Sequence, residues 1–163
     1  MRPSLSRIAC LSLLAAFPLF AEDAAGWRQT FEAAPKGWET QGKPGVANAV
    51  FDSGHEDGTN RVLRMTSDKA SATFKSGKLS VDLTKTPVMR WRWKAVTLPT
   101  GADGSKDKLD DQAIGLYVST GGMFSQKSVA LRWETDTPKG ATGKAKYGAG
   151  VVCIFWKCIR NKD

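Results

Sequence analysis

Carboxylates are the side chains of this sequence best suited to chemistry, and several gather in one long polar segment, residues 98–112. Asp103, Asp110 and Asp111 lie in this segment. Their oxygens are the hard ligands that Ca²⁺ prefers, so the three are candidate calcium ligands, although their spacing fits no EF-hand loop. The alternative is a solvated loop whose Asp side chains accept hydrogen bonds from nearby backbone N–H groups. A polar connection of this length is often a binding loop.

A pair of carboxylates could also hydrolyse a glycosidic bond, which requires two carboxyl groups about 5–5.5 Å or 6.5–9.5 Å apart. Asp110 or Asp111 could pair with Glu134 or Asp136, but nothing in the spacing selects these four over the other acids. The single histidine, His55, lies in a turn-like stretch with no nucleophile elbow nearby. We therefore assign no catalytic residue and favour a protein that is not an enzyme.

Composition and charge describe an ordinary globular domain. The 163 residues include 24 Lys and Arg against 16 Asp and Glu, a net charge of +8, with 41% apolar and 25% charged residues. These proportions argue against disorder, collagen and coiled coil. The basic excess could attract acidic polysaccharide or anionic lipid. Because the lysines are spread along the chain, the simpler interpretation is that they keep the protein soluble.

The amino-terminal residues have the pattern of a targeting signal. Arg2 and Arg7 precede an apolar run from Ile8 to Phe20, and Ala21 leads into an acidic pair. This order is typical of a secretory signal peptide, and the run is shorter than the roughly 20 residues that span a bilayer. We predict a signal peptide over 1–21 and an exported protein of the periplasm or cell exterior. The mature chain is expected to have no transmembrane segment and no nucleic-acid partner.

Two cysteines, Cys153 and Cys158, remain after the predicted signal. An oxidising compartment favours their pairing. Five residues along a straight strand, however, separate two Cα atoms by about 16 Å, whereas a disulfide requires roughly 4.4–6.8 Å. A disulfide between them therefore requires the segment to turn. On a single strand, both thiols would be free or paired elsewhere.

Alternating apolar and polar residues, bounded by Gly, Pro, Asn and Asp, recur along the chain. This pattern predicts an all-β fold, an antiparallel β-sandwich of the jelly-roll type, as a single domain over residues 22–163. No window has a clear helical periodicity. The predicted strands are Trp27–Phe31, Ala47–Phe51, Val62–Thr66, Ala70–Phe74, Lys78–Asp82, Val88–Val96, Ala113–Ser119, Ser128–Glu134 and Val151–Trp156.

The clearest of these strands, Val88–Val96, has Trp91 and Trp93 on one face and Arg90 and Arg92 on the other. Trp buries a large apolar area, so core packing is the simpler interpretation of the Trp face. A sugar-stacking platform on an open face is the alternative.

The strand Ser128–Glu134 is predicted to turn its apolar side chains inward and its charged side chains outward. The inward set is Val129, Leu131 and Trp133, and the outward set is Arg132 and Glu134. Arg92 could then pair with Glu134 across strands. Aromatic or charged residues on such faces and in turns are the candidate ligand-binding residues: Trp38, Arg90, Arg92, Asp110, Asp111 and Glu134.

Several short motifs together resemble a known family. Trp-Arg-Trp at 91–93 is followed by Leu-Pro-Thr-Gly-Ala-Asp at 98–103 and by Asp-Asp-Gln at 110–112. This combination resembles the bacterial exported family called domain-of-unknown-function family 3047, over about residues 27–150. The resemblance implies a β-sandwich similar to carbohydrate-binding jelly rolls, an extracytoplasmic location and no established activity. Members of that family continue further, so this chain is expected to be shortened at its C-terminus.

These observations predict a non-catalytic module that binds a polysaccharide or another cell-envelope component. Two alternatives stay open. One is a polysaccharide-active enzyme, a glycoside hydrolase or lyase, on a sandwich scaffold. The other is a structural or partner-binding protein of the periplasm. No cofactor is assigned apart from the candidate Ca²⁺.

Overall fold

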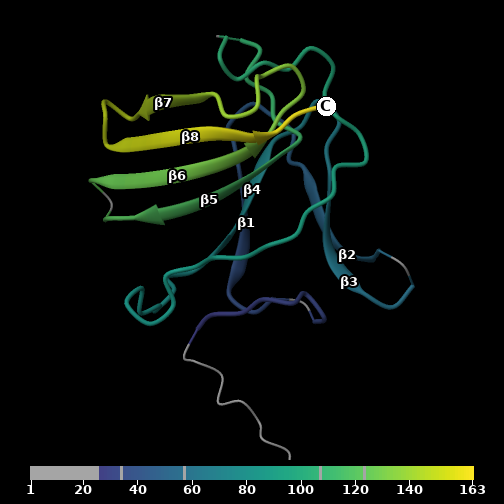
Figure 1. Ribbon diagram of the computed structural model, residues 1–163, viewed down its shortest axis with the longest axis vertical. Helices are drawn as coiled ribbons and strands as arrows, with labels where there is room; N and C mark the ends of the chain where they lie inside the picture. The colour runs from purple at the N-terminus through teal and green to yellow at the C-terminus, as the bar shows by residue number, and fades with distance from the viewer. Residues whose placement is uncertain (1–25, 34, 57, 107, 123) are drawn as a thin grey trace, which may run out of the picture. The chain divides into compact units, whose positions relative to one another are not determined.

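The computed structural model describes residues 26–33, 35–56, 58–106, 108–122 and 124–163. The predicted signal peptide, residues 1–21, lies outside these ranges. Within them the fold is all-β, with no helix and hence none that could cross a membrane (Figure 1). The strands are β1 (Trp38–Gly42), β2 (Val50–His55), β3 (Arg61–Thr66), β4 (Ala72–Ser76), β5 (Ile114–Thr120), β6 (Gln126–Trp133), β7 (Thr142–Tyr147) and β8 (Val152–Arg160).

The all-β class is confirmed, and the alternating pattern located most of the strands. β3, β5, β6 and β8 coincide with predicted strands, and predicted segments overlap the beginnings of β2 and β4. β1 and β7 were not predicted. The segments Trp27–Phe31 and Lys78–Asp82 do not form strands, so these two predictions are wrong.

The chain divides into two compact units, of which the first ends at Arg90. This unit contains two antiparallel pairs, β1 with β4 and β2 with β3. The ring centroid of Phe74 on β4 lies 5.1 Å from those of both Trp38 on β1 and Phe51 on β2. Stacked and tilted aromatic rings at this distance attract one another, so they join the two small sheets.

The second unit, Trp91–Asp163, contains one four-stranded sheet in the order β5-β6-β8-β7. β5 pairs with β6, and β7 with β8, in antiparallel fashion, whereas β6 and β8 run parallel. The sheet is therefore mixed and not purely antiparallel as predicted. Parallel neighbours need a crossover longer than a hairpin turn, and residues 134–151, which include β7, supply it. The single domain predicted over 22–163 stays a prediction.

The two faces of the four-stranded sheet differ in chemistry. The register of β6 and β8 places Ala130 and Arg132 on the same face as Trp156 and Cys158, and all four side chains are buried. The opposite face carries the apolar side chains of β6, including Val129, which is 52% exposed. The buried face of β6 is thus its more polar face.

This arrangement is the reverse of the one predicted for Ser128–Glu134. Ser128, Arg132 and Glu134 are buried, while Leu131 and Trp133 are only half-buried, so the predicted sides of this strand are wrong. Alternating apolar and polar residues show that a strand has two different faces. The apolar face can be taken as the buried one only if the polar side chains of the other face have no partners inside the protein. Here the charges of Arg132 and Glu134 pair with each other, and other residues of the second unit cover them.

The segment Val88–Val96 is not a strand, because no ladder of hydrogen bonds pairs it with a described neighbour. The alternating positions of Trp91 and Trp93 in this segment still bring the two rings close to each other. The rings of Trp91 and Trp93 lie 5.8 Å apart, and Trp93 lies 6.0 Å from Trp133. Trp93 is half-buried, so packing on the sheet accounts for its position, whereas Trp91 is exposed.

Gly143 on β7 is required by the indole of Trp156, because a Cβ atom added there would lie 2.2 Å from Cζ2 of that ring. We expect Gly143→Ala to lower the free energy of unfolding by about 1–3 kcal/mol, since the ring must shift to make room. Urea denaturation followed by Trp fluorescence measures the change. Gly122→Ala is the matched control, because no described atom lies within 4 Å of an added Cβ there. Equal stability of the two variants would contradict this packing.

Candidate functional site

A buried pair of charges lies at the end of β6. Arg132 and Glu134 are 3% and 0% exposed, and Nη1 of Arg132 donates to Oε1 of Glu134 over 3.3 Å. The two residues are two positions apart on an extended chain, so their side chains project from the same face. Charges removed from water are costly unless they are paired and fully hydrogen-bonded. The surrounding loops supply the remaining bonds of Glu134.

The loop before β5 closes over Glu134. The N–H of Gly104 lies 3.1 Å from Oε2 of Glu134 and 2.8 Å from Oγ1 of Thr137 and donates to both. The Thr137 hydroxyl donates to the same Oε2. A Cβ atom at position 104 would lie 2.5 Å from both carboxylate oxygens, so only Gly permits this approach. Each oxygen of Glu134 therefore has a donor, and the carboxylate is fixed.

The Asp103 carboxylate stabilises the conformation of the same loop by binding the two residues that follow Gly104. Its Oδ1 accepts hydrogen bonds from the N–H and hydroxyl of Ser105 over 3.0 and 2.6 Å, and its Oδ2 lies 2.9 Å from Nζ of Lys106. These donors, the Ser105 hydroxyl foremost, hold the pKa of Asp103 well below its ordinary value. The Asx turn considered as the alternative to a calcium site is present here, and protein donors occupy this carboxylate.

Arg132 is held in place by an aromatic ring as well as by Glu134. The centre of its guanidinium lies 5.1 Å from the ring centroid of Trp156, a cation–π distance. Among the described residues, only Nη1 of this guanidinium has a hydrogen-bond partner, and Nε is buried without one. A buried donor without a partner carries a free-energy cost, and in a cleft it indicates a place for a ligand atom.

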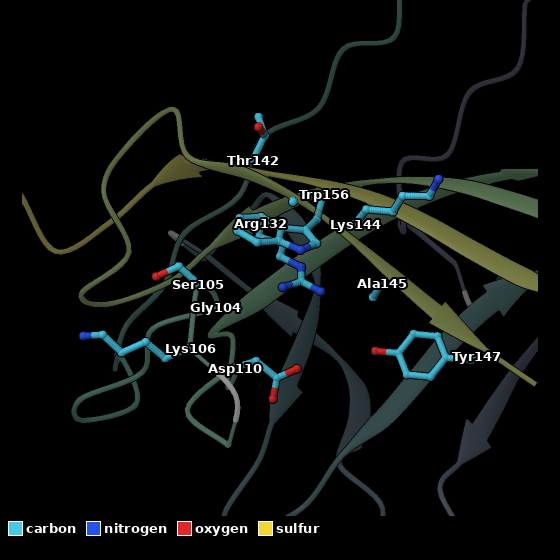
Figure 2. A pocket seen from close by; sticks show the side chains of 11 residues that line it. Gly104, Ser105, Lys106, Asp110, Arg132, Thr142, Lys144, Ala145, Tyr147 and Trp156 are labelled. Carbon is cyan, nitrogen blue, oxygen red and sulfur yellow. The ribbon is translucent and has the colours of Figure 1, made fainter. Parts of the chain in front are cut away.

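A cleft of about 390 Å³ opens beside Arg132. Figure 2 shows the guanidinium projecting into the space between Asp110 and Tyr147. Residues 104–106 line one side of this cleft, residues 142–145 and Tyr147 line another, and Trp156 lies against Arg132. Because β7 is an edge strand of the sheet, its outer backbone N–H and C=O groups are available to a bound molecule. We call this site the Arg132 cleft.

The structure brings together only part of the predicted ligand-binding set. Asp110 lines the Arg132 cleft, and Glu134 lies behind it, paired with Arg132 and not with Arg92. Asp111 is exposed and is not one of the lining residues. Arg90 and Arg92 are exposed.

Trp38, the remaining candidate, belongs to the aromatic cluster of the first unit. Its ring centroid lies 6.3 Å from that of Trp27 and 5.8 Å from that of Phe31, in addition to the contact with Phe74. Packing accounts for this position, so Trp38 is not assigned to the Arg132 cleft.

The three acidic residues proposed as calcium ligands do not form a cluster. Within the part of the chain that the structure describes, no three His, Cys, Asp or Glu side chains lie close enough to hold a metal ion. Asp103 is buried and occupied by Ser105 and Lys106, whereas Asp110 and Asp111 are exposed.

Cys153 and Cys158 lie on one strand, β8, with both thiols free, so the turn that a disulfide between them would require is not present in this segment. Burial raises the pKa of the Cys158 thiol, and the Glu134 carboxylate raises it further. A buried, protonated thiol is a poor nucleophile. Cys158 therefore has a packing role on the buried face of β8.

Three residues of the cleft, Arg132, Tyr147 and Trp156, were not identified from the sequence as site residues. The sequence does contain a signal for Arg132, because an Arg and a Glu two positions apart on a strand share a face and can form an ion pair. Tyr147 belongs to β7, which was not predicted, and Trp156 meets Arg132 only through the parallel register of β6 and β8.

The chain belongs to the family described as "Protein of unknown function (DUF3047)", which matches residues 36–156. This match confirms the resemblance carried by the Trp-Arg-Trp, Leu-Pro-Thr-Gly-Ala-Asp and Asp-Asp-Gln motifs. It extends beyond the expected limit at residue 150 and includes Trp156. No curated protein and no solved structure matches the chain.

Replacing Glu134 by Gln should strongly destabilise the second unit, because the buried Arg132 charge then has no counter-charge. We expect the free energy of unfolding to fall by about 3–5 kcal/mol. Urea denaturation measures it.

Asp136→Asn is the control for this variant. It removes a nearby carboxylate whose 2.7 Å ion pair with Lys162 is partly open to solvent. Ion pairs that are open to solvent contribute about 0–1 kcal/mol to the free energy of unfolding. If Glu134→Gln cost no more than Asp136→Asn, the Arg132–Glu134 pair would not be the structural centre of the unit.

Proposed function

We propose that this protein is an exported, non-catalytic β-sandwich module that binds a saccharide of the cell envelope or surroundings in the Arg132 cleft. The observation that carries the proposal is the cleft itself, where a buried guanidinium, whose Nε has no partner in the part of the chain that the structure describes, lies beside exposed polar and aromatic groups. Export rests on the sequence pattern of residues 1–21. The sandwich form and the carbohydrate ligand rest on the all-β fold and on the composition of the cleft.

The groups around the cleft suit a saccharide. A sugar presents hydroxyl groups that both donate and accept hydrogen bonds, together with apolar C–H faces. Asp110 can accept from hydroxyls, whereas Lys106 and Arg132 can donate to them. The ring of Tyr147 is 51% exposed and can pack against a sugar face while its hydroxyl stays in water.

The state of the carboxylates supports binding over hydrolysis. Both oxygens of Glu134 are engaged by Arg132, Gly104 and Thr137, so this group is not available as a proton donor or nucleophile. Of the carboxylates that the structure describes, Asp110 is the one that lines the cleft. A glycosidase of the usual type needs two working carboxylates across the bond.

The test is saccharide binding by the mature chain, first on an array of neutral and acidic glycans and then by calorimetry with the best binder. Tyr147→Ala should weaken binding roughly three- to tenfold, because it removes a stacking contact. Binding to no saccharide at all would contradict the proposed function.

Phe155→Ala is the matched control for Tyr147→Ala. Phe155 is also an exposed aromatic residue of the same sheet, 45% accessible, but it lies on the face opposite to Trp156. We expect its removal to leave saccharide affinity unchanged. If Phe155→Ala abolished binding and Tyr147→Ala did not, the ligand would occupy the other face and the assignment to the Arg132 cleft would be wrong.

A further inference from the structure

Building on the proposed function, we infer that the saccharide bound in the Arg132 cleft is acidic and that its carboxylate occupies the Nε and Nη2 edge of Arg132. The ligand class is therefore a uronic acid or an oligosaccharide that contains one. This inference names the chemical group that the cleft selects, which the family description leaves open.

The first argument is the unused edge of the guanidinium. Nη1 donates to Glu134, and neither Nε nor Nη2 has a partner among the described residues. Nε–H and one N–H of Nη2 lie in the plane of the guanidinium and point the same way from one edge of it, so together they form a fork. A carboxylate is the group whose two oxygens match this fork in a bidentate pair.

The second argument is that this edge is preorganised. Glu134 fixes one side of the guanidinium, and the ring of Trp156 lies along its face at 5.1 Å. Trp156 in turn lies against Gly143, where no larger residue fits. Little side-chain freedom is left for Arg132 to lose on binding, which favours affinity. An Arg held in this way by a buried network is suited to recognising one planar group.

The third argument is charge. The second unit carries twelve Lys and Arg against seven Asp and Glu, so its field favours an anion. Glu134 neutralises Arg132 from behind, and Asp110 lines the cleft. Two carboxylates beside one cleft disfavour a doubly charged phosphate more than a singly charged carboxylate. Asp110 is suited instead to accept hydrogen bonds from the hydroxyls of the sugar ring.

The test compares trigalacturonate with its methyl ester, which has the same rings and hydroxyls without the charge. Calorimetry on the mature wild-type chain should show binding of trigalacturonate that is about tenfold to hundredfold tighter than that of the ester. Equal affinity for the two would overturn the carboxylate inference while leaving saccharide binding intact. No binding of either, together with no binding on the glycan array, would overturn the proposed function itself.

Inorganic sulfate at constant ionic strength serves as a competitor. We expect it to displace trigalacturonate only at far higher concentration, because it lacks the sugar hydroxyls. Displacement at a concentration similar to that of trigalacturonate would show a general anion site, and the inference of a uronate would be wrong.

Arg132→Lys tests the residue assignment, because it keeps the charge beside Glu134 but removes the fork. We expect it to lose most of the preference for trigalacturonate over the ester, and an unchanged preference would overturn the assignment. If this variant does not fold, the Nε–H resonance of Arg132 in the ¹⁵N-labelled wild-type chain decides. It should shift with trigalacturonate and stay in place with the ester, and the absence of that difference would overturn the assignment equally.

Discussion

The burial of the Arg132–Glu134 ion pair is the constraint on which the second unit depends. Two charges have left water, and each must find its bonds within the protein. Glu134 finds them in Arg132, in the Gly104 N–H and in the Thr137 hydroxyl. Among the described residues, Arg132 has one hydrogen-bond partner, Glu134, and its guanidinium lies over the ring of Trp156. The carboxylate is therefore satisfied by the fold, whereas the guanidinium is held in place but left with unused donors.

Several local features follow from that constraint. The loop at 103–106 must approach the carboxylate, which requires Gly104 and an Asp103 turned inward onto Ser105 and Lys106. The indole of Trp156 must lie over β7, which requires Gly143. These two close approaches shape the cleft whose walls are the loop and the edge strand. Structure and proposed function thus share one set of side chains, because the groups that cover the ion pair also line the place where a ligand would bind.

The sequence predicts the all-β class well, because strand-length alternation separated by turn residues is a local property. It predicts less about pairing. Val88–Val96 has the best alternation in the chain, yet an extended segment becomes a strand only if a neighbour supplies hydrogen bonds. Ser128–Glu134 has two distinct faces, but which one is buried depends on the pairing of Arg132 with Glu134. β7 contains Gly143 and two lysines, so its own composition gave little sign that Trp156 would pack against it.

Binding of trigalacturonate to the double variant Arg132→Met, Glu134→Leu most directly tests whether this ion pair exists to present a guanidinium to a ligand. Removing both charges together leaves no unpaired charge in the interior, so the second unit should stay folded. The account predicts that calorimetry detects no binding of trigalacturonate to this variant. Binding with the affinity of the wild-type chain would contradict it, because the ligand would then not depend on Arg132.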